Sequence, residues 1–298
     1  MGGTPPHGAH GPLSALRSPT AQAIMRSVAR RSPAFLLAAL ALGFAVAAAL
    51  ALTLPSLGQG DANSPELRPD LVQRLPSELV TRGNDDRFEL GFTSAVENRG
   101  DGPLRVNGRR RPGSNDMSGD QFIRRADGSS ARIAGVGTLR YTTSAGHRHW
   151  HLLGFDRYEL RRASNHALVK PDRKTGFCLG DRYETSYRSK YKPSQAPHAS
   201  NNCRPNEPTA NAVAMAISVG YGDDYHAYLE GQSLEVTGLR AGQYELVHRV
   251  NADGTLREKR YANNAASVRF ELSWPAGTNE RPRAEVLERC ATSARCAP

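Results

Sequence analysis

The sequence lacks the features that several protein classes require. Its 298 residues include only four cysteines, which excludes a disulfide-dense miniprotein, and aromatic residues make up 7% of the chain. A single apolar run is long enough to cross a bilayer, so a multi-span membrane bundle is excluded. No collagen-like or coiled-coil period is present, and the length allows one large domain or two small ones.

The apolar run Ala34–Leu54 is predicted to be a targeting segment. It carries no charge, and as a helix it would be about 31 Å long, enough to cross the hydrocarbon core. Arginines but no acidic residues precede the run, so the positive-inside rule predicts that the N-terminus stays in the cytoplasm. The rest of the chain would then be exported, and either secreted or anchored to the outer face of the cell membrane. Its length favours an uncleaved anchor over a signal peptide. We expect a basic cytoplasmic leader (1–33), a transmembrane anchor or signal segment (34–54) and a linker (55–66).

The chain is basic. Its formal net charge is +10, and removing the four arginines of the leader leaves +6 (10 − 4) on the exported part, with a dense run at Arg109–Arg111. This charge suits an anionic cell envelope or an acidic substrate surface, but a solvated face is the simpler interpretation. Nucleic-acid binding requires interleaved aromatic residues or a known module, and neither is present, so we expect no nucleic-acid partner.

The exported part alternates short β-type runs with turn signals and has almost no helical period. Turn-forming segments such as Asn98–Pro103 and Asn251–Gly254 separate the runs. This spacing predicts a mainly β fold, an antiparallel β-sandwich with long irregular loops, over residues 67–275, followed by a polar tail over 276–298. The clearest predicted strands are Arg87–Glu97, Phe155–Arg161, Gln243–Val250 and Ala266–Leu272.

The cysteines can form disulfides outside the membrane. Four cysteines allow three pairings, and proximity in sequence favours Cys178–Cys203 and Cys290–Cys296. A four-thiolate metal site is the alternative, but the closely spaced CxxC pairs that such sites use are absent. We therefore predict two disulfides and a polar tail closed by the second of them.

The segment Gly146–His151 (GHRHWH) places three imidazoles at alternate positions. In a strand, alternation puts His147, His149 and His151 on one face, and neutral imidazole binds copper, zinc, iron and nickel. A straight strand would hold the first and last about 13 Å apart, too far for bonds of about 2.0 Å to one ion. We therefore expect a metal site on a bent or irregular segment, and Gly146 lowers the cost of the bend.

These histidines resemble the copper-binding segment of the lysyl oxidase family, in which an HxHxH run precedes a strand of the type FxxYxL, here Phe155–Leu160. Further motifs occur in the family's order, and the resemblance covers roughly residues 67–274. These motifs are Pro69–Leu71 with Val96–Gly100, Lys174–Asp181 (KTGFCLGD), Ser218–Tyr225 (SVGYGDDY), and Gly242–Leu246 with Asn263–Asn264.

The resemblance implies a copper-dependent amine oxidase that converts primary amines, either peptidyl lysine or small amines, to aldehydes. Dioxygen would be the oxidant, and hydrogen peroxide and ammonia would be released. The family pattern implies a copper ion on the three histidines and a lysyl tyrosylquinone that the protein makes from Lys174 and Tyr225. Of the family's cysteines, Cys178 carries over through its motif, whereas Tyr221 stands where the family has a cysteine before the quinone tyrosine.

Quinone formation requires the Lys174 amine to be neutral, because only the neutral amine is a nucleophile. Burial lowers the pKa of a lysine, so we expect Lys174 to be buried. The catalytic base is less well defined by the residue pattern. The candidates are Asp223, which matches the family motif, then Asp224, and more weakly His226 and His248.

Two other interpretations remain open. A metal-binding extracellular β-sandwich module would use the histidines for structure or adhesion without quinone chemistry. A metal-dependent hydrolase or oxygenase would use three histidines, an open coordination position and a nearby carboxylate. Neither alternative uses Lys174 or Tyr225, so the distance between these two side chains separates the amine oxidase from both.

Overall fold

The computed structural model describes residues 61–84, 86–144, 147–199 and 203–297, apart from the side chains of 84 and 171–175. The described residues belong to the compact unit Gln59–Pro298. The predicted leader and anchor segment, 1–54, lies outside them. Among the residues that are described, no helix is long and apolar enough to cross a membrane.

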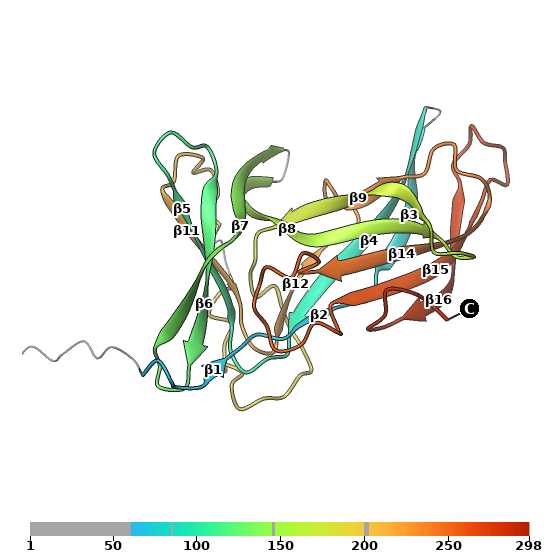
Figure 1. Cartoon of the computed structure of the whole chain (residues 1–298). Coiled ribbons are helices and arrows are strands. Elements are labelled where there is room, and N and C mark those ends of the chain that lie inside the picture. Colours follow the sequence, from blue (N-terminus) through green and yellow to red (C-terminus); the bar gives the residue numbers. More distant parts are fainter. Residues whose placement is uncertain (1–60, 85, 145–146, 200–202, 298) are drawn as a thin grey trace, which may run out of the picture. The chain divides into compact units, whose positions relative to one another are not determined.

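Strands joined by turns and loops make up the described residues, with no helix among them (Figure 1). The strand pairings are antiparallel. The mainly β, antiparallel architecture predicted from the alternating runs is confirmed. The strands are β1 (Glu66–Leu67), β2 (Leu71–Gln73), β3 (Ser77–Asn84), β4 (Arg87–Asn98), β5 (Leu104–Arg110), β6 (Met117–Arg125), β7 (Ser130–Ser144), β8 (His147–Arg162), β9 (Leu168–Phe177), β10 (Tyr183–Glu184), β11 (Ala212–Ile217), β12 (Tyr221–Tyr225), β13 (Ser233–Glu235), β14 (Gly242–Val250), β15 (Ala265–Ser273) and β16 (Arg283–Cys290).

Two sheets organise these strands. The larger has the order β11-β5-β6-β7-β8-β14-β15-β16, with β1 beside β6 and β9 beside β8. In the smaller sheet β4 is the shared partner of β2, β3, β12 and β13, and β10 pairs with β12. Figure 1 shows β8 in the interior of the larger sheet, where it connects the green strands β5 to β7 with the orange and red strands β14 to β16.

Three of the clearest predicted strands correspond closely to β4, β14 and β15. The fourth, Phe155–Arg161, is only the second half of β8, which begins at the histidine segment. Gly154 has φ 71°, and the register between β8 and β9 shifts between Leu152 and Asp156. An irregularity at a glycine that tolerates positive φ therefore separates the two halves of one long strand.

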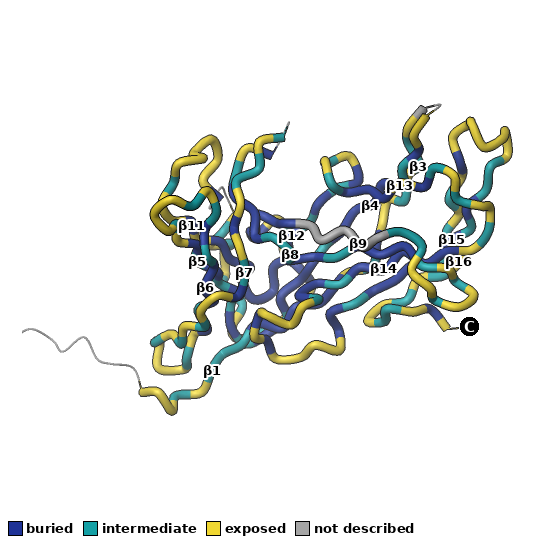
Figure 2. The backbone as a smooth tube through the Cα atoms, turned by 45° about the horizontal axis from the view of Figure 1, so that its top comes forward, coloured by how far each residue is buried: buried dark blue, intermediate teal, exposed yellow. Residues whose placement is uncertain are grey.

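Two clusters of buried side chains form the core. Figure 2 shows how buried residues are distributed along the strands. The first includes Trp150, Phe177 and Tyr225, with apolar side chains of β5, β6, β7 and β11. In the second, side chains of β4 pack against β8, β14 and β15, and the rings of Phe92 and Tyr158 lie 4.8 Å apart. Because β8 contributes to both clusters, its packing fixes the histidine segment relative to the rest of the domain.

The segment 276–298, expected as a polar tail, contains an edge strand. β16 pairs with β15, and its residues alternate between exposed and half-buried. The predicted Cys290–Cys296 and Cys178–Cys203 disulfides are both formed. Sequence analysis missed β16 because charged residues occupy both of its faces, a composition common on edge strands that avoid further pairing.

A buried carboxyl group interrupts the core between β4 and β8. Asp156 is fully buried, the Ser94 hydroxyl donates a hydrogen bond to its Oδ2 at 2.6 Å, and the Arg157 amide donates to its Oδ1 at 2.9 Å. Burial raises the pKa of Asp156 to about 7, because a carboxylate removed from water loses more solvation than these hydrogen bonds restore.

Replacing Asp156 by asparagine is expected to remove a pH dependence of stability. The pKa of Asp156 is about 7 in the folded protein against an ordinary value of 3.8. Between these values the folded state holds a proton that the unfolded state has lost, so the free energy of unfolding falls as the pH rises and does not recover above about 7. Asparagine keeps both hydrogen bonds, since its oxygen can accept from the Arg157 amide and its Nδ2 can donate to Ser94.

Urea unfolding between about pH 4 and about pH 8 should show this difference. Over the interval the profile of Asp156→Asn should be flatter than that of the wild type by on the order of a few kcal/mol. Superimposable profiles would contradict a neutral, buried Asp156.

Candidate functional site

The three candidate histidines lie at the start of β8, in its hairpin with β7. The ladder pairs His147 with Ser144 and His151 with Arg140 without a register shift. Strand alternation therefore places the three imidazoles on one face. His147 and His151 are each 5% exposed, so this face is covered by other side chains.

The three rings gather although their strand pairs regularly. Ring centroids lie 5.5 Å apart for His147 and His149, 5.2 Å for His147 and His151, and 4.7 Å for His149 and His151. The end of the β7–β8 hairpin curls instead of continuing straight (Figure 1). The rings are thus much closer than the about 13 Å that a straight strand gives to its first and last histidine.

Burial keeps these imidazoles in the neutral form that binds a metal ion. It lowers the pKa of His147, that of His149 to about 4 and that of His151 to about 3. The Nε2 atoms of His149 and His151 are 2.8 Å apart. This distance fits an N–H···N hydrogen bond, and it also fits two ligands of one ion, since bonds of about 2.0 Å at a right angle place their nitrogens about 2.8 Å apart. The donor set therefore suits copper and the other metals that imidazole binds.

Tyr225 lies beside the histidine cluster, at the end of β12. Its ring centroid is 5.8 Å from that of His147 and 6.1 Å from that of His151. Phe177 packs against the tyrosine ring at 4.1 Å, and Tyr225 is 4% exposed. Burial raises the pKa of the phenol, so at neutral pH the hydroxyl is protonated and enclosed by rings.

The turn Phe177–Asp181 holds Tyr225 by its hydroxyl group. The Cys178 amide donates a hydrogen bond to the Tyr225 hydroxyl oxygen at 2.9 Å, and the Gly180 amide donates to Asp223 Oδ2 at 3.1 Å. Tyr225 and Asp223 are alternate residues of β12 and therefore project from the same face. Two neighbouring side chains of one strand thus bind two amides of one turn, which fixes the position of the phenol oxygen.

Asp223 is fully buried, and burial raises its pKa to about 8. Arg182 opposes this shift, because its Nε lies 3.5 Å from Asp223 Oδ1. The Oδ1 atom accepts no hydrogen bond from the described residues. Sequence analysis missed Arg182, although it directly follows the motif Lys174–Asp181.

Lys174 lies in β9, where its backbone is opposite Arg157 of β8. Its side chain is outside the described residues, so its burial and its distance from Tyr225 stay predictions. The β9 backbone itself runs close to the histidines, since a Cβ placed on Gly176 would lie 2.9 Å from the Cβ of His151. The fold therefore brings the lysine-bearing strand to the histidine segment.

The other predicted bases lie in different surroundings. Asp224 is half-buried, and its Oδ2 is 3.5 Å from Nε2 of the half-exposed His226. His248 is fully buried in the second core cluster, with its ring 4.8 Å from Phe92 and 4.5 Å from Tyr158. Neither ring nitrogen of His248 has a hydrogen-bond partner among the described residues, so it faces no proton donor or acceptor there.

A disulfide connects the tyrosine side of the site to the histidine side. Cys178, whose amide binds Tyr225, is joined to Cys203. The Cys203 carbonyl accepts a hydrogen bond at 2.9 Å from the amide of Trp150, which stands between His149 and His151. One covalent bond therefore restrains both the phenol oxygen and the histidine strand.

Glu288, Cys290 and Cys296 also lie close enough together to share an ion. The two cysteines form a disulfide, however, and metals bind the thiolate form of cysteine. This group at the edge of the larger sheet is therefore not a ligand set. In the described part of the chain, the ring nitrogens of His147, His149 and His151 do not all lie within 4.8 Å of one another, so a metal centre at the three histidines stays a prediction.

Comparisons with known proteins identify related sequences over this region. Residues 136–276 match the family model described as lysyl oxidase. Protein-lysine 6-oxidase of Gallus gallus is 28% identical over 120 residues, which are 40% of this chain and 24% of that protein. The Sus scrofa and Bos taurus proteins of the same name are each 30% identical over 129 residues, which are 43% of this chain and 45% and 27% of those proteins. The chain thus spans less than half the length of these curated relatives, and the family resemblance inferred from the motifs is confirmed over 136–276.

Replacing Tyr225 by phenylalanine is expected to destabilise the metal-free protein. Without the hydroxyl, the buried Cys178 amide loses its acceptor, which costs on the order of 1–3 kcal/mol. Tyr228→Phe is the matched control, because Tyr228 is 76% exposed, and it should change stability by less than about 0.5 kcal/mol. Urea denaturation measures both variants, and equal stabilities would show that the Cys178–Tyr225 hydrogen bond does not support the fold.

Proposed function

We propose that this chain, which matches the lysyl oxidase family over residues 136–276, is a copper-dependent amine oxidase with a lysyl tyrosylquinone made from Lys174 and Tyr225. It would oxidise primary amines, either peptidyl lysine or small amines, to aldehydes and release hydrogen peroxide and ammonia. The observation that supports this proposal best is the packing of one buried tyrosine ring against two of three gathered imidazoles.

His147, His149 and His151 would hold the copper ion. Copper with dioxygen, when bound, supplies the oxidising power that converts the Tyr225 ring, and the finished cofactor supplies the electrophilic carbon that a primary amine attacks. The contribution of the chain is to lower the imidazole pKa values by burial. The ring nitrogens then remain available as ligands at neutral pH, because no proton competes for them.

The turn Phe177–Asp181 would position the reacting ring. The Cys178 amide already points at the Tyr225 oxygen, and a fixed backbone donor stabilises negative charge on that oxygen without reorganisation. Phe177 covers one face of the ring, and the 4% exposure of Tyr225 limits the approach of water. Because water is largely excluded, the tyrosine ring would react with protein groups or with a substrate that enters the site, and not with bulk water.

Lys174 would supply the amine that joins the tyrosine ring. It precedes Cys178 by four positions in the chain, and the Cys178 amide touches the Tyr225 hydroxyl. Lys174 and Tyr225 are 51 residues apart in the sequence (225 − 174). The backbone of β9 and the segment after it nevertheless bring the lysine position to within four residues of the contact with Tyr225. We propose that the Lys174 amine is neutral and faces the tyrosine ring.

Asp223 would act as the proton acceptor. It lies on the Tyr225 side of β12, its Oδ2 is occupied by the Gly180 amide, and its Oδ1 accepts no hydrogen bond from the described residues. A carboxylate whose pKa is raised to about 8 binds a proton more tightly than an ordinary one, which suits a base that works near neutral pH. Asp223→Asn is therefore expected to keep the turn in place and lose turnover.

The two disulfides fit an oxidising, extracellular compartment. We propose that residues 34–54 direct export and that the protein is secreted or held at the outer face of the cell membrane. We further propose that residues 67–275 form one catalytic domain in which the two sheets pack as a sandwich, with the metal centre at the β7–β8 hairpin.

Copper binding tests the ligand set. The triple variant His147→Ala, His149→Ala, His151→Ala should bind copper at least about a hundredfold more weakly, because all three imidazole ligands are lost. His226→Ala is the control, since His226 is half-exposed and contacts carboxylates. Isothermal titration of the metal-free proteins measures the affinities, and unchanged affinity in the triple variant would refute the assignment.

The quinone pair has its own test. Lys174→Ala and Tyr225→Phe should each abolish amine-dependent peroxide release while copper affinity stays within about twofold, because neither residue is a proposed ligand. Wild-type protein treated with copper and oxygen should yield a crosslinked Lys174–Tyr225 peptide in mass spectrometry. Unmodified peptides from protein that oxidises amines would exclude the mechanism, and tight copper binding without crosslink or activity would favour the metal-binding module.

A further inference from the structure

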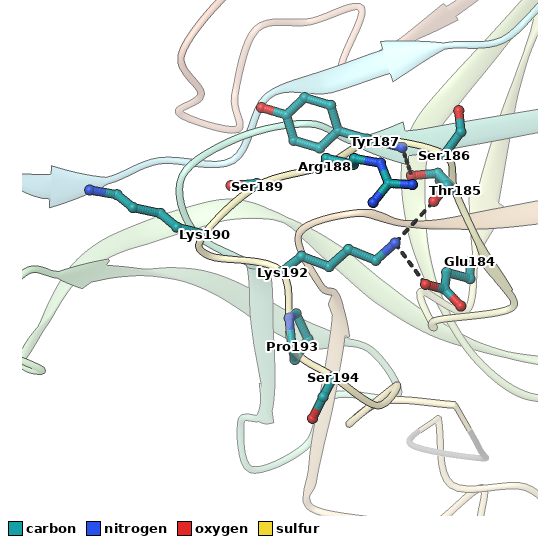
Figure 3. A pocket seen from close by; sticks show the side chains of 10 residues that line it. All are labelled: Glu184, Thr185, Ser186, Tyr187, Arg188, Ser189, Lys190, Lys192, Pro193 and Ser194. Carbon is teal, nitrogen blue, oxygen red and sulfur yellow. Dashed lines mark hydrogen bonds and ion pairs between the residues drawn. The ribbon is translucent and has the colours of Figure 1, made fainter.

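A large surface hollow lies within the loop that follows β10, outside the histidine and tyrosine site. Its volume is about 820 Å³. Residues of 184–190 and 192–194 provide the lining, and Figure 3 shows their side chains. Ser186, Ser189, Ser194 and Tyr187 are part of this lining, whereas the Thr185 hydroxyl already donates a hydrogen bond to the Gly220 carbonyl at 2.9 Å.

The charges around the hollow are mostly positive. Lys192 pairs with Glu184 at 2.8 Å and donates to the Thr185 carbonyl at 3.0 Å. Arg188 is exposed and forms no ion pair with the described residues, and Figure 3 shows its guanidinium turned toward the Thr185 side of the hollow. Because Lys192 already neutralises Glu184, the Arg188 charge has no partner in the lining of the hollow.

A second basic hollow adjoins the first. It has a volume of about 450 Å³, and Pro193 lines both hollows. Arg105 of β5 and Arg124 of β6 line the second hollow, together with the Tyr191 ring and the Ser130 and Ser218 side chains. Within the described part of the chain, neither arginine forms an ion pair, so two further positive charges without an acidic partner line this hollow.

From these two hollows we propose a binding surface for an acidic polysaccharide, a chain of sugars that carry carboxylate groups. One carboxylate would pair with Arg188 in the first hollow, and another with Arg105 or Arg124 in the second. Each contact is a charge-assisted hydrogen bond, for which the planar guanidinium is well suited. The chain would pass over Pro193, which lies between the hollows.

The lining favours a sugar over an acidic peptide. A pyranose ring offers hydroxyl groups around its edge and C–H groups on its faces, and the first hollow offers three serine side chains and an aromatic ring. An aspartate or glutamate side chain would use the arginine and leave the hydroxyls and most of the volume to water. Tyr191 supplies a second ring in the neighbouring hollow, where it is partly exposed beside Pro193.

This surface does not depend on the proposed amine oxidation. Its residues lie in 103–130, 184–198 and 218–219, and none of them is a proposed metal ligand or a member of the quinone pair. In an extracellular protein with an excess of basic residues, such a surface would hold the domain near an anionic matrix. Loss of polymer binding and loss of amine oxidation can therefore be measured separately.

The test uses the full chain and polygalacturonate, with neutral dextran and polyglutamate as comparison polymers. The variant is Arg188→Gln, Arg124→Gln. Its matched control is Arg283→Gln, Arg289→Gln, which removes the same charge from β16 at the opposite edge of the larger sheet. Affinity is measured by isothermal titration at about 0.05 M and about 0.2 M salt.

The wild type should bind polygalacturonate more weakly at the higher salt concentration and should not bind dextran. The Arg188→Gln, Arg124→Gln variant should bind polygalacturonate at least about tenfold more weakly, and the β16 control should stay within about twofold of wild type. Absence of wild-type binding, or equal losses in both variants, would overturn the proposal. Polyglutamate binding as tight as polygalacturonate binding, with the same dependence on Arg188 and Arg124, would overturn the choice of a sugar chain.

Discussion

The site depends on one short turn, Phe177–Asp181, and on the disulfide that ties it down. The amides of this turn bind Tyr225 and Asp223 of β12, and the Cys178–Cys203 bond connects it to the segment that holds the Trp150 amide. Closing a loop of 25 residues in this way stabilises the folded state by about 3.5 kcal/mol in the chain-entropy model. The tyrosine ring, the lysine-bearing strand and the histidine strand are therefore restrained together.

A second group of hydrogen bonds joins a segment near the start of the domain, at residues 70–71, to a segment near its end, at 258–264. Asn263 donates a hydrogen bond to Asp70 at 3.0 Å, and the buried Glu258 accepts one from the Leu71 amide at 2.9 Å and one from Asn264 at 2.6 Å. These contacts join two of the motifs on which the family resemblance was based. Asn263 Oδ1 and Asn264 Oδ1 accept no hydrogen bond from the described residues, but the bonds that are formed make the relative position of the two segments specific.

Much of the fold was predictable because its signals are local. The runs that became β4, β14 and β15 alternate polar and apolar residues over a whole strand, and the cysteine pairs are close in sequence. β16 and the charged strand β5 escaped detection, because arginine and glutamate on the solvent face of a strand resemble a loop. The buried Asp156 was also missed, since nothing in its neighbours shows that its strand faces another sheet.

For the site, the sequence by itself determined which residue types stand at which spacing: three imidazoles on one face of a strand, and a lysine and a tyrosine in recognisable motifs. Only the tertiary structure decided that the rings of His147 and His151 lie 5.2 Å apart, that Tyr225 packs against them, and that the Cys178 amide binds the tyrosine oxygen. The curl of the hairpin and the approach of β12 to the turn result from packing between segments distant in the chain. Alternation fixes the direction of a side chain along its own strand, whereas distances between strands depend on the whole core.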